Sequence, residues 1–229
     1  MRILYVFAHP DDESFGPGLA MADQAAAGHE VYLLTLSSGE ASKERAWLGL
    51  TRRELADVRR RELHAAGREL GLAGVRVMRF PDGRLRTYAG RARRVILSTL
   101  RAIRPQVAVG FPDDGINGHP DHVYAHRALR NAWLTWRAHQ IHPVRLAYVQ
   151  VPADAAPPGV QGMAAGEADV EHLASSEALL RCEQALLCHR SQAAVIEAYR
   201  PLEGLRGRVW FSLEGEPQDA PLTDLSAGL

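Results

Sequence analysis

Short apolar segments alternate with helix-like segments along the chain as far as residue 151. The apolar segments resemble buried strands, and the segments between them are Ala-rich or carry apolar residues three to five positions apart, as amphipathic helices do. The expected strands are 2–8, 30–36, 75–80, 106–111 and 145–151, and the expected helices are 17–28, 51–71, 88–103 and 120–138. This order predicts an α/β fold that is Rossmann-like and doubly wound, with a mostly parallel sheet and helices on both faces.

The rest of the chain gives no sign of a second domain. Residues 152–170 are rich in Ala, Pro and Gly and predict a loop, whereas 173–189 predict a helix and "VWFSLEG" at 209–215 predicts a last strand. Neither an internal repeat nor a break in composition is present. We therefore expect a single domain over 1–229, with core βα units over 1–151 and a C-terminal loop, helix and closing strand over 152–229.

Composition argues against several classes of protein. The 27 basic and 27 acidic residues cancel, whereas a nucleic-acid-binding protein usually has a basic excess. Apolar runs stay well below the roughly 18 residues of a membrane span, and the N-terminus reads as a strand instead of a signal peptide. Cys182 and Cys188 fit free thiols of a reducing compartment better than a disulfide or a metal pair. These features predict a cytoplasmic protein with neither nucleic-acid nor membrane partners.

Two charged loops follow strands of the predicted sheet. They read "AHPDDE" at 8–13 and "GHPDH" at 118–122, and the carboxyl ends of such strands are where α/β sheets bind ligands. Carboxylates are costly at the end of a buried strand unless they are paired or bind a metal. Alone, the acidic run could be a helix cap and His9 a surface histidine. Two such loops on one edge instead predict a divalent metal site, of the mixed His and carboxylate kind that catalytic zinc uses.

With these motifs the sequence resembles the LmbE-like or PIG-L family of metal-dependent N-acetylglucosaminyl de-N-acetylases. The resemblance covers most of residues 2–150, and "AHPDDE" and "GHPDH" are specific to it when they occur together. Supporting segments are "SSGE", "RRRELHAAGRELG", "FPDG" and "HRSQ". The resemblance implies the LmbE-like deacetylase fold and a hydrolase that removes the acetyl group from an N-acetylglucosamine-type amino sugar or conjugate.

The resemblance also implies the roles of the motif residues. Asp11 would be the general base that activates water, and His119 would act as general acid or as a partner of the oxyanion. Asp121 would orient His119. The metal would be Zn²⁺, although two histidines and one carboxylate accept other divalent ions. The implied metal ligands are His9, Asp12 and His122.

Four further residues are candidates for contact with the substrate: three match positions near the sugar in such enzymes, and one replaces a residue of the family. Three of them are Glu40, Arg59 and Asp82, but Arg59 lies in a basic run typical of a solvated helix face, and Asp82 precedes a turn glycine. The fourth is Asn117, which stands where some members carry a tyrosine that donates to the oxyanion. His189 in "HRSQ" could support the site or be purely structural, and the sequence does not separate these roles.

Other functions remain open at this point. A metallo-phosphoesterase would keep the fold and the metal, but no phosphate-binding glycine loop is present. A non-catalytic sugar-binding protein would not need a complete set of ligands and base. A dinucleotide-binding domain would carry its glycine fingerprint after the first strand, where this chain has "AHPDDESFG". The expected partner is a small N-acetylated amino sugar, such as a glucosamine conjugate of malate or inositol; homo-oligomers are compatible with the sequence but not indicated by it.

Overall fold

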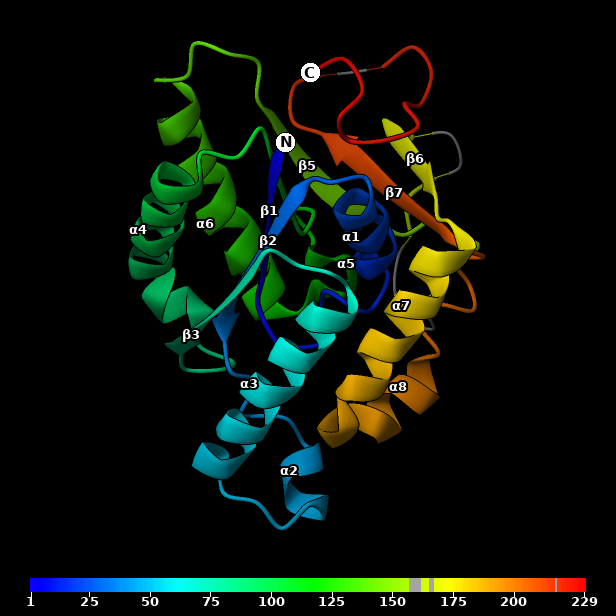
Figure 1. The fold of residues 1–229 in the computed structure, drawn as a ribbon. Coiled ribbons are helices and arrows are strands. Elements are labelled where there is room, and N and C mark those ends of the chain that lie inside the picture. The colour runs from blue at the N-terminus through cyan, green and yellow to red at the C-terminus, as the bar shows by residue number, and fades with distance from the viewer. Residues whose placement is uncertain (157–161, 165–166, 217) are drawn as a thin grey trace.

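The computed structural model describes residues 1–156, 162–164, 167–216 and 218–229. Over these residues the strands form one seven-stranded sheet in the order β3-β2-β1-β4-β5-β7-β6 (Figure 1). The strands are β1 (Arg2–Phe7), β2 (Glu30–Ser37), β3 (Gly74–Phe80), β4 (Val107–Gly110), β5 (Arg145–Gln150), β6 (Val170–Leu173) and β7 (Arg208–Leu213). The expected α/β fold is therefore confirmed.

The direction of winding reverses at β1. This strand pairs in parallel with β2 on one side and with β4 on the other. After β1 the chain forms β2 and β3 on one side of this strand, and it then crosses to the other side to form β4 and β5. In sheets of this kind the crevice between the two central strands, at their carboxyl ends, is the usual ligand site. Here that crevice lies where β1 and β4 end.

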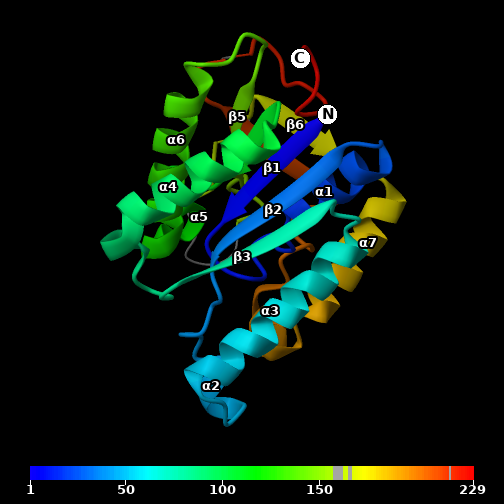
Figure 2. The same ribbon diagram turned by 60° about the vertical axis from the view of Figure 1, so that its left-hand side comes forward.

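Helices cover both faces of the sheet. The helices α4 and α6 pack together on one face, and α7 packs with α1 and α3 on the other (Figures 1 and 2). Because both faces are covered, every residue of β1 after Arg2 is buried. The helices are α1 (Pro17–Ala26), α2 (Glu44–Trp47), α3 (Arg52–Glu69), α4 (Leu85–Ile103), α5 (Gly115–Gly118), α6 (Pro120–Arg137), α7 (Ser176–Cys188) and α8 (Ala193–Tyr199), with a 3₁₀ turn at Arg190–Gln192.

The long helix α3 illustrates how local sequence sets an element. Thr51 accepts a hydrogen bond from the amide of Glu54, and the Glu54 side chain accepts one from the amide of Thr51. Such a capping box satisfies two amides that the first turn leaves unpaired, and a helix cap contributes about 1 kcal/mol. The helix buries Leu55, Leu63 and Arg59, and the last of these reaches the candidate site.

The C-terminal part differs most from expectation. The predicted closing strand is β7, but it runs antiparallel to β5 and to β6. The strand β6 falls partly within the segment predicted as a loop, and the short helices α2, α5 and α8 were not expected. Residues 157–161 and 165–166 of the predicted loop lie outside the described part. Both cysteines are free, as predicted. Among the described helices, none has the length and apolar character needed to cross a membrane.

Candidate active site

The first motif forms a tight turn directly after β1. The amide of Ser14 donates to the carbonyl of Asp11 at 2.8 Å, and α1 begins at Pro17. Asp11 has a φ of 99°, a backbone conformation that residues with a side chain rarely adopt. Such a conformation costs about 1–3 kcal/mol and persists only where the surroundings enforce it. The structure therefore holds Asp11 in a set orientation.

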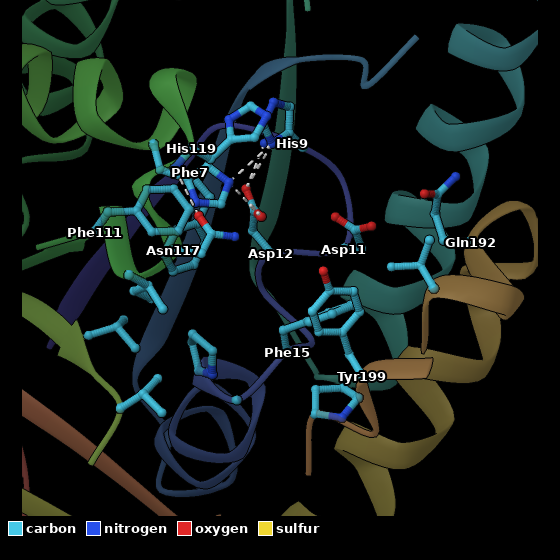
Figure 3. Close-up of a pocket in the computed structure, with 18 of the residues that line it drawn as sticks. Phe7, His9, Asp11, Asp12, Phe15, Phe111, Asn117, His119, Gln192 and Tyr199 are labelled. Atoms are coloured by element: carbon cyan, nitrogen blue, oxygen red, sulfur yellow. Dashed lines mark hydrogen bonds and ion pairs between the residues drawn. The ribbon is translucent and has the colours of Figure 1, made fainter. Parts of the chain in front are cut away.

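Donor atoms of three residues from the two motifs converge at this edge of the sheet. Nε2 of His122 lies 3.3 Å from Nδ1 of His9 and 3.4 Å from Oδ1 of Asp12. Nδ1 of His9 lies 3.7 Å from Oδ2 of Asp12 (Figure 3). Atoms that share a tetrahedral zinc ion at about 2.0–2.2 Å are roughly 3.3–3.6 Å apart. The two separations from Nε2 of His122 fall within this range, and the third, which is measured to the other Asp12 oxygen, is slightly longer. The residues present therefore fit a zinc-sized cation in donor type, and His119 brings a further ring nitrogen within 4.8 Å of those of His9 and His122.

The ring of His122 is fixed by its own loop. Its Nδ1 hydrogen-bonds the carbonyl of Gly115 at 3.1 Å, and the ring stacks on Phe111 with centroids 4.0 Å apart. A Cβ on Gly115 would come within 2.7 Å of Cβ of His122, and φ at this glycine is 71°. Glycine is therefore required there for the histidine to lie where it does, a point that the sequence did not reveal.

The other nitrogen of His9 faces carboxylates. Its Nε2 lies 3.1 Å from Oδ1 of Asp82 and 3.5 Å from Oδ2 of Asp121. Burial alone would disfavour a charge on His9, but Asp121, Asp82 and Asp12 outweigh it and raise the pKa of His9 to about 10. The carboxylates around His9 thus favour a positive charge at this point, which either a proton or a cation could supply. Carboxylates that hold the outer nitrogen of a ligating histidine are common around metal centres.

Asp12 is held as an ionised acceptor. Its Oδ2 accepts hydrogen bonds from the amides of His9 at 2.7 Å and Ala8 at 3.1 Å, so Oδ1 is directed at His122. Burial opposes ionisation, but the charges and hydrogen bonds of His122 and His9 hold the pKa of Asp12 well below its usual range.

Asp11 lies beside the donor cluster without belonging to it. Oδ2 of Asp11 accepts from Nη2 of Arg59 at 2.9 Å, and the guanidinium also donates to the carbonyls of Gly39 and Pro10. Burial raises the pKa of Asp11 to about 6, although Arg59 acts in the opposite direction. Arg59 is only 3% exposed, so the interpretation of its basic run as a solvated face does not apply to this residue.

The buried pair of Glu13 and His189 supports Asp11, and Glu13 was not among the residues predicted from the sequence. Oε2 of Glu13 accepts from the amide of Asp11 at 3.1 Å, and Oε1 of Glu13 lies 2.6 Å from Nε2 of His189. Ser14 donates to the same oxygen at 2.6 Å. Glu13 stands in "AHPDDE", but its role depends on the distant "HRSQ" segment, and no local pattern indicates that contact.

His119 and Asp121 lie at the start of α6, where the structure differs from expectation. Nδ1 of His119 accepts from the backbone amide of Asp121 at 3.2 Å, which places the proton of a neutral ring on Nε2. Burial and the charges of His9 and His122 lower the pKa of His119. The carboxylate of Asp121 instead accepts from the amides of Gly83 at 2.7 Å and Leu85 at 3.0 Å. Asp121 therefore orients His119 through its backbone, and its side chain faces His9.

The residues expected near a sugar mostly make contacts within the protein. Oδ2 of Asp82 accepts from the amide of Ala41 at 2.7 Å, and Glu40 accepts from the amide of Asp82 at 2.9 Å. Asn117 accepts from the amide of His119 at 3.0 Å. Asp82, Arg59 and Asn117 line a cavity of about 740 Å³ that also contains the donor cluster, whereas Glu40 does not.

The doubly wound sheet and the donor cluster at its switch point define the class, an α/β protein with a candidate metal centre. A family model described as GlcNAc-PI de-N-acetylase, PIG-L, matches residues 4–133. The chain belongs to this family.

A curated relative from Catenulispora acidiphila is 39% identical over 161 residues, which are 60% of this chain and 53% of the relative. That relative is a 1D-myo-inositol 2-acetamido-2-deoxy-alpha-D-glucopyranoside deacetylase. The chain spans about half the length of the curated relatives it matches.

Solved structures confirm the fold but do not fix the reaction. N,N'-diacetylchitobiose deacetylase from Pyrococcus horikoshii has a TM-score of 0.71 at 18% identity, covering 93% of this chain and 83% of that one. A 4-carboxy-2-hydroxymuconate hydratase from Pseudomonas putida has a TM-score of 0.73 at 17% identity, covering 97% and 99% of the two chains. Because a deacetylase and a hydratase share this fold, the reaction has to be argued from the site.

Proposed function

We propose that this protein is a zinc-dependent hydrolase that removes the acetyl group from an N-acetylglucosamine-type amino sugar or conjugate. The observation that carries the proposal is the convergence of donor atoms of His9, Asp12 and His122, with the carboxylate of Asp11 beside this cluster but outside it. A bound zinc ion lowers the pKa of water to about 7 and polarises a carbonyl. The named relatives act on amide bonds of this kind, which supports the same chemistry here.

Side chains of the site supply the proton transfer, the charge stabilisation and the positioning that amide hydrolysis also needs. Asp11 takes the proton of the attacking water and can return it to the leaving amine. The Nε2–H group of His119 donates a hydrogen bond to the carbonyl oxygen of the amide, on which negative charge develops. Arg59 and Glu13 keep Asp11 in place through its carboxylate and its amide, respectively. Removing one such acid–base group typically costs about 10²–10⁴ in rate.

The class of substrate follows from the bond that is proposed to be hydrolysed. An acetamido group on a sugar supplies the amide, and the relatives' names point to an inositol conjugate as the first compound to test. Arg59 and Asp82 are committed to protein contacts, so we propose that they support the site more than they bind hydroxyls. Asn117 is exposed at the cavity and remains a candidate for contact with the substrate.

The test is amine release from N-acetylglucosamine and its methyl, inositol and malate conjugates, with zinc and with a chelator. Zinc-dependent release that Asp11→Asn abolishes would support the proposal. Hydrolysis of an aryl phosphate without amine release would favour a phosphoesterase instead. Sugar binding without turnover by zinc-loaded protein would favour a non-catalytic role, and hydration of an unsaturated acid would favour the chemistry of the hydratase relative.

A further inference from the structure

A second hollow lies at one edge of the sheet, apart from the cavity of the candidate active site. It has a volume of about 550 Å³ and lies between α4 and β3, the strand that forms this edge (Figure 2). None of its lining residues lines the cavity of the donor cluster. Four arginines border the hollow, and we call them the arginine cluster: Arg76, Arg79, Arg91 and Arg94. In the described part of the chain no acidic residue lines it, so positive charge is concentrated there.

The charge of this region differs strongly from that of the whole chain. Residues 74–106 contain nine arginines and one acidic residue, whereas the full sequence has 27 basic and 27 acidic residues. The one acidic residue is Asp82, whose Oδ1 lies 3.1 Å from Nε2 of His9, so it belongs to the other site. The rest of the chain is correspondingly acidic. An arginine-rich composition therefore does not by itself account for the excess here.

The guanidinium groups of the arginine cluster have no carboxylate partner among the residues that the structure describes. Other arginines do have one: Arg130 lies 2.6 Å from Glu214, and Arg145 lies 3.1 Å from Glu216. All four residues of the cluster are exposed. Like charges that share one hollow repel one another, so the arrangement becomes more favourable when an anion lies among them.

An aromatic surface positions one arginine of the cluster. Cζ of Arg91 lies 5.8 Å from the centre of the Tyr88 ring, and that ring packs against Phe80 with centroids 6.0 Å apart. A guanidinium at this distance is attracted by the face of the ring. The helix residues Tyr88, Arg91, Val95 and Ser98 follow one another at intervals of three or four positions, so a single face of α4 borders the hollow.

Arginines on an edge strand have a simpler use, which is to keep that edge from pairing with another strand. Arg76 and Arg79 lie on β3 and fit this use. Arg91 and Arg94 lie on α4, where they take no part in strand pairing. Arginines of a solvated helix face need no common focus, whereas these two border the same hollow as the strand arginines. Their convergence therefore favours a binding site.

We propose that the arginine cluster binds a phosphate monoester, carried either by a small metabolite or by a lipid headgroup. A phosphate monoester has nearly two negative charges at pH 7 and three acceptor oxygens, so it accepts hydrogen bonds from several guanidinium groups at once. A carboxylate has one charge and two oxygens, which a single guanidinium satisfies. This inference is independent of the proposed function, because the cluster shares no residue with the candidate active site.

The first experiment measures binding of glycerol 3-phosphate to the zinc-loaded protein by calorimetry, with acetate as the carboxylate control. The salt concentration is about 0.1 M, at which distant charges are screened. We expect a Kd below about 1 mM for the phosphate and at least tenfold weaker binding of acetate. Equal binding of the two anions would overturn the assignment of a phosphate site.

A second arm tests the lipid headgroup as the source. Vesicles with phosphatidic acid, a phosphate monoester, are compared by cosedimentation with vesicles of phosphatidylglycerol, a phosphodiester, at matched total lipid charge. At least threefold more protein on the phosphatidic acid vesicles, without binding of glycerol 3-phosphate, identifies a headgroup, whereas binding of the free compound identifies a metabolite. Failure of both arms would overturn the inference, and so would binding of a single-stranded oligonucleotide in their place.

Two double variants with the same loss of charge show where the phosphate binds. Arg76→Gln with Arg91→Gln removes half of the cluster, whereas Arg53→Gln with Arg101→Gln removes two exposed arginines that line neither cavity. We expect at least tenfold weaker binding in the first variant and less than twofold in the second, with zinc content and thermal unfolding unchanged in both. Equal weakening would show a dependence on overall charge alone. Unchanged binding in the first variant would place the phosphate elsewhere, for example on the zinc, and either result would overturn the inference.

Discussion

Oε1 of Glu13 and Nε2 of His189 lie 2.6 Å apart, and neither side chain is exposed by more than 1%. The other oxygen of Glu13 accepts from the amide of Asp11, whose φ is 99°. Burial disfavours a charged imidazole, but Glu13 outweighs this effect and raises the pKa of His189. The pair therefore ties the C-terminal segment to the backbone of the residue that we propose as the base.

This pair should affect turnover more than substrate affinity. We expect His189→Ala to lower kcat about 10–100-fold with little change in KM, because Asp11 would lose part of its support. His189→Gln keeps a donor and should recover much of the loss. Steady-state kinetics on all three proteins would check this. If the alanine variant is less stable in urea but keeps its kcat, the pair is purely structural.

Substitutions of the adjacent carboxylates Asp11 and Asp12 should have different effects. We expect Asp11→Asn to retain zinc and lower kcat by about 10²–10⁴, the usual cost of removing an acid–base group. Asp12→Asn should weaken zinc binding, because an anionic donor becomes a neutral amide. Metal titration combined with kinetics would distinguish the two. Loss of zinc from both variants, or from neither, would contradict the assigned roles.

Two glycines of α5 provide a controlled test of how His122 is held. Gly115 and Gly118 share a φ of 71°, but a Cβ would meet His122 at 2.7 Å only at Gly115, and nothing lies within 4 Å at Gly118. In both alanine variants the backbone conformation should lower the free energy of unfolding by about 1–2 kcal/mol. Gly115→Ala should lose a further ~1–3 kcal/mol from crowding, together with zinc affinity. Urea unfolding and zinc titration would measure this, and equal effects would refute it.

Asp23 should make a contribution to stability that depends on pH. It accepts hydrogen bonds from Ser175 at 2.6 and 2.9 Å and lies 2.9 Å from Nε2 of His172. Burial acts to raise its pKa, but the bonds to Ser175 and the contact with His172 outweigh burial and lower it. A carboxyl with a depressed folded-state pKa stabilises the protein above its unfolded pKa of about 3.9, and this stabilisation is lost as pH falls below that value.

The stability difference between wild type and Asp23→Asn isolates this contribution. We expect the wild type to be the more stable of the two at pH 7 and pH 5, and the difference to shrink at pH 3.5. Urea unfolding at the three pH values would measure it. A difference that stays constant would show that Asp23 has no pH linkage, and one that grows toward pH 3.5 would show linkage of the opposite sign.

Sequence patterns predicted the parallel part of the fold because its signals are local. Apolar runs and helix periodicity identified β1 to β5 and the helices between them, and the two motifs fell at the predicted edge. The partners of Asp82 and Arg59 could not be predicted in this way. Asp82 meets His9 and Ala41, and Arg59 meets Gly39 and Asp11, through contacts between loops far apart in the sequence.

The antiparallel end of the sheet escaped prediction for a similar reason. The strand β6 has only four residues, and its pairing with β7 spans more than thirty positions of the chain. A short run of mixed polarity such as Val170–Leu173 carries no period of its own. The lining of the cavity is likewise assembled from separate segments, and only the folded chain brings Val151 and Leu205 into one cavity.

The convergence of His9 and His122 across 113 positions has a consequence for folding. A cation shared by these residues would act as a cross-link, closing a loop that covers half of the chain. Because His9 and His122 are apart in the unfolded chain, such a cation would bind the folded state alone and would stabilise it by that binding. Zinc binding would then report that β1 and β4 are correctly paired, because the two halves of the site meet only when those strands do.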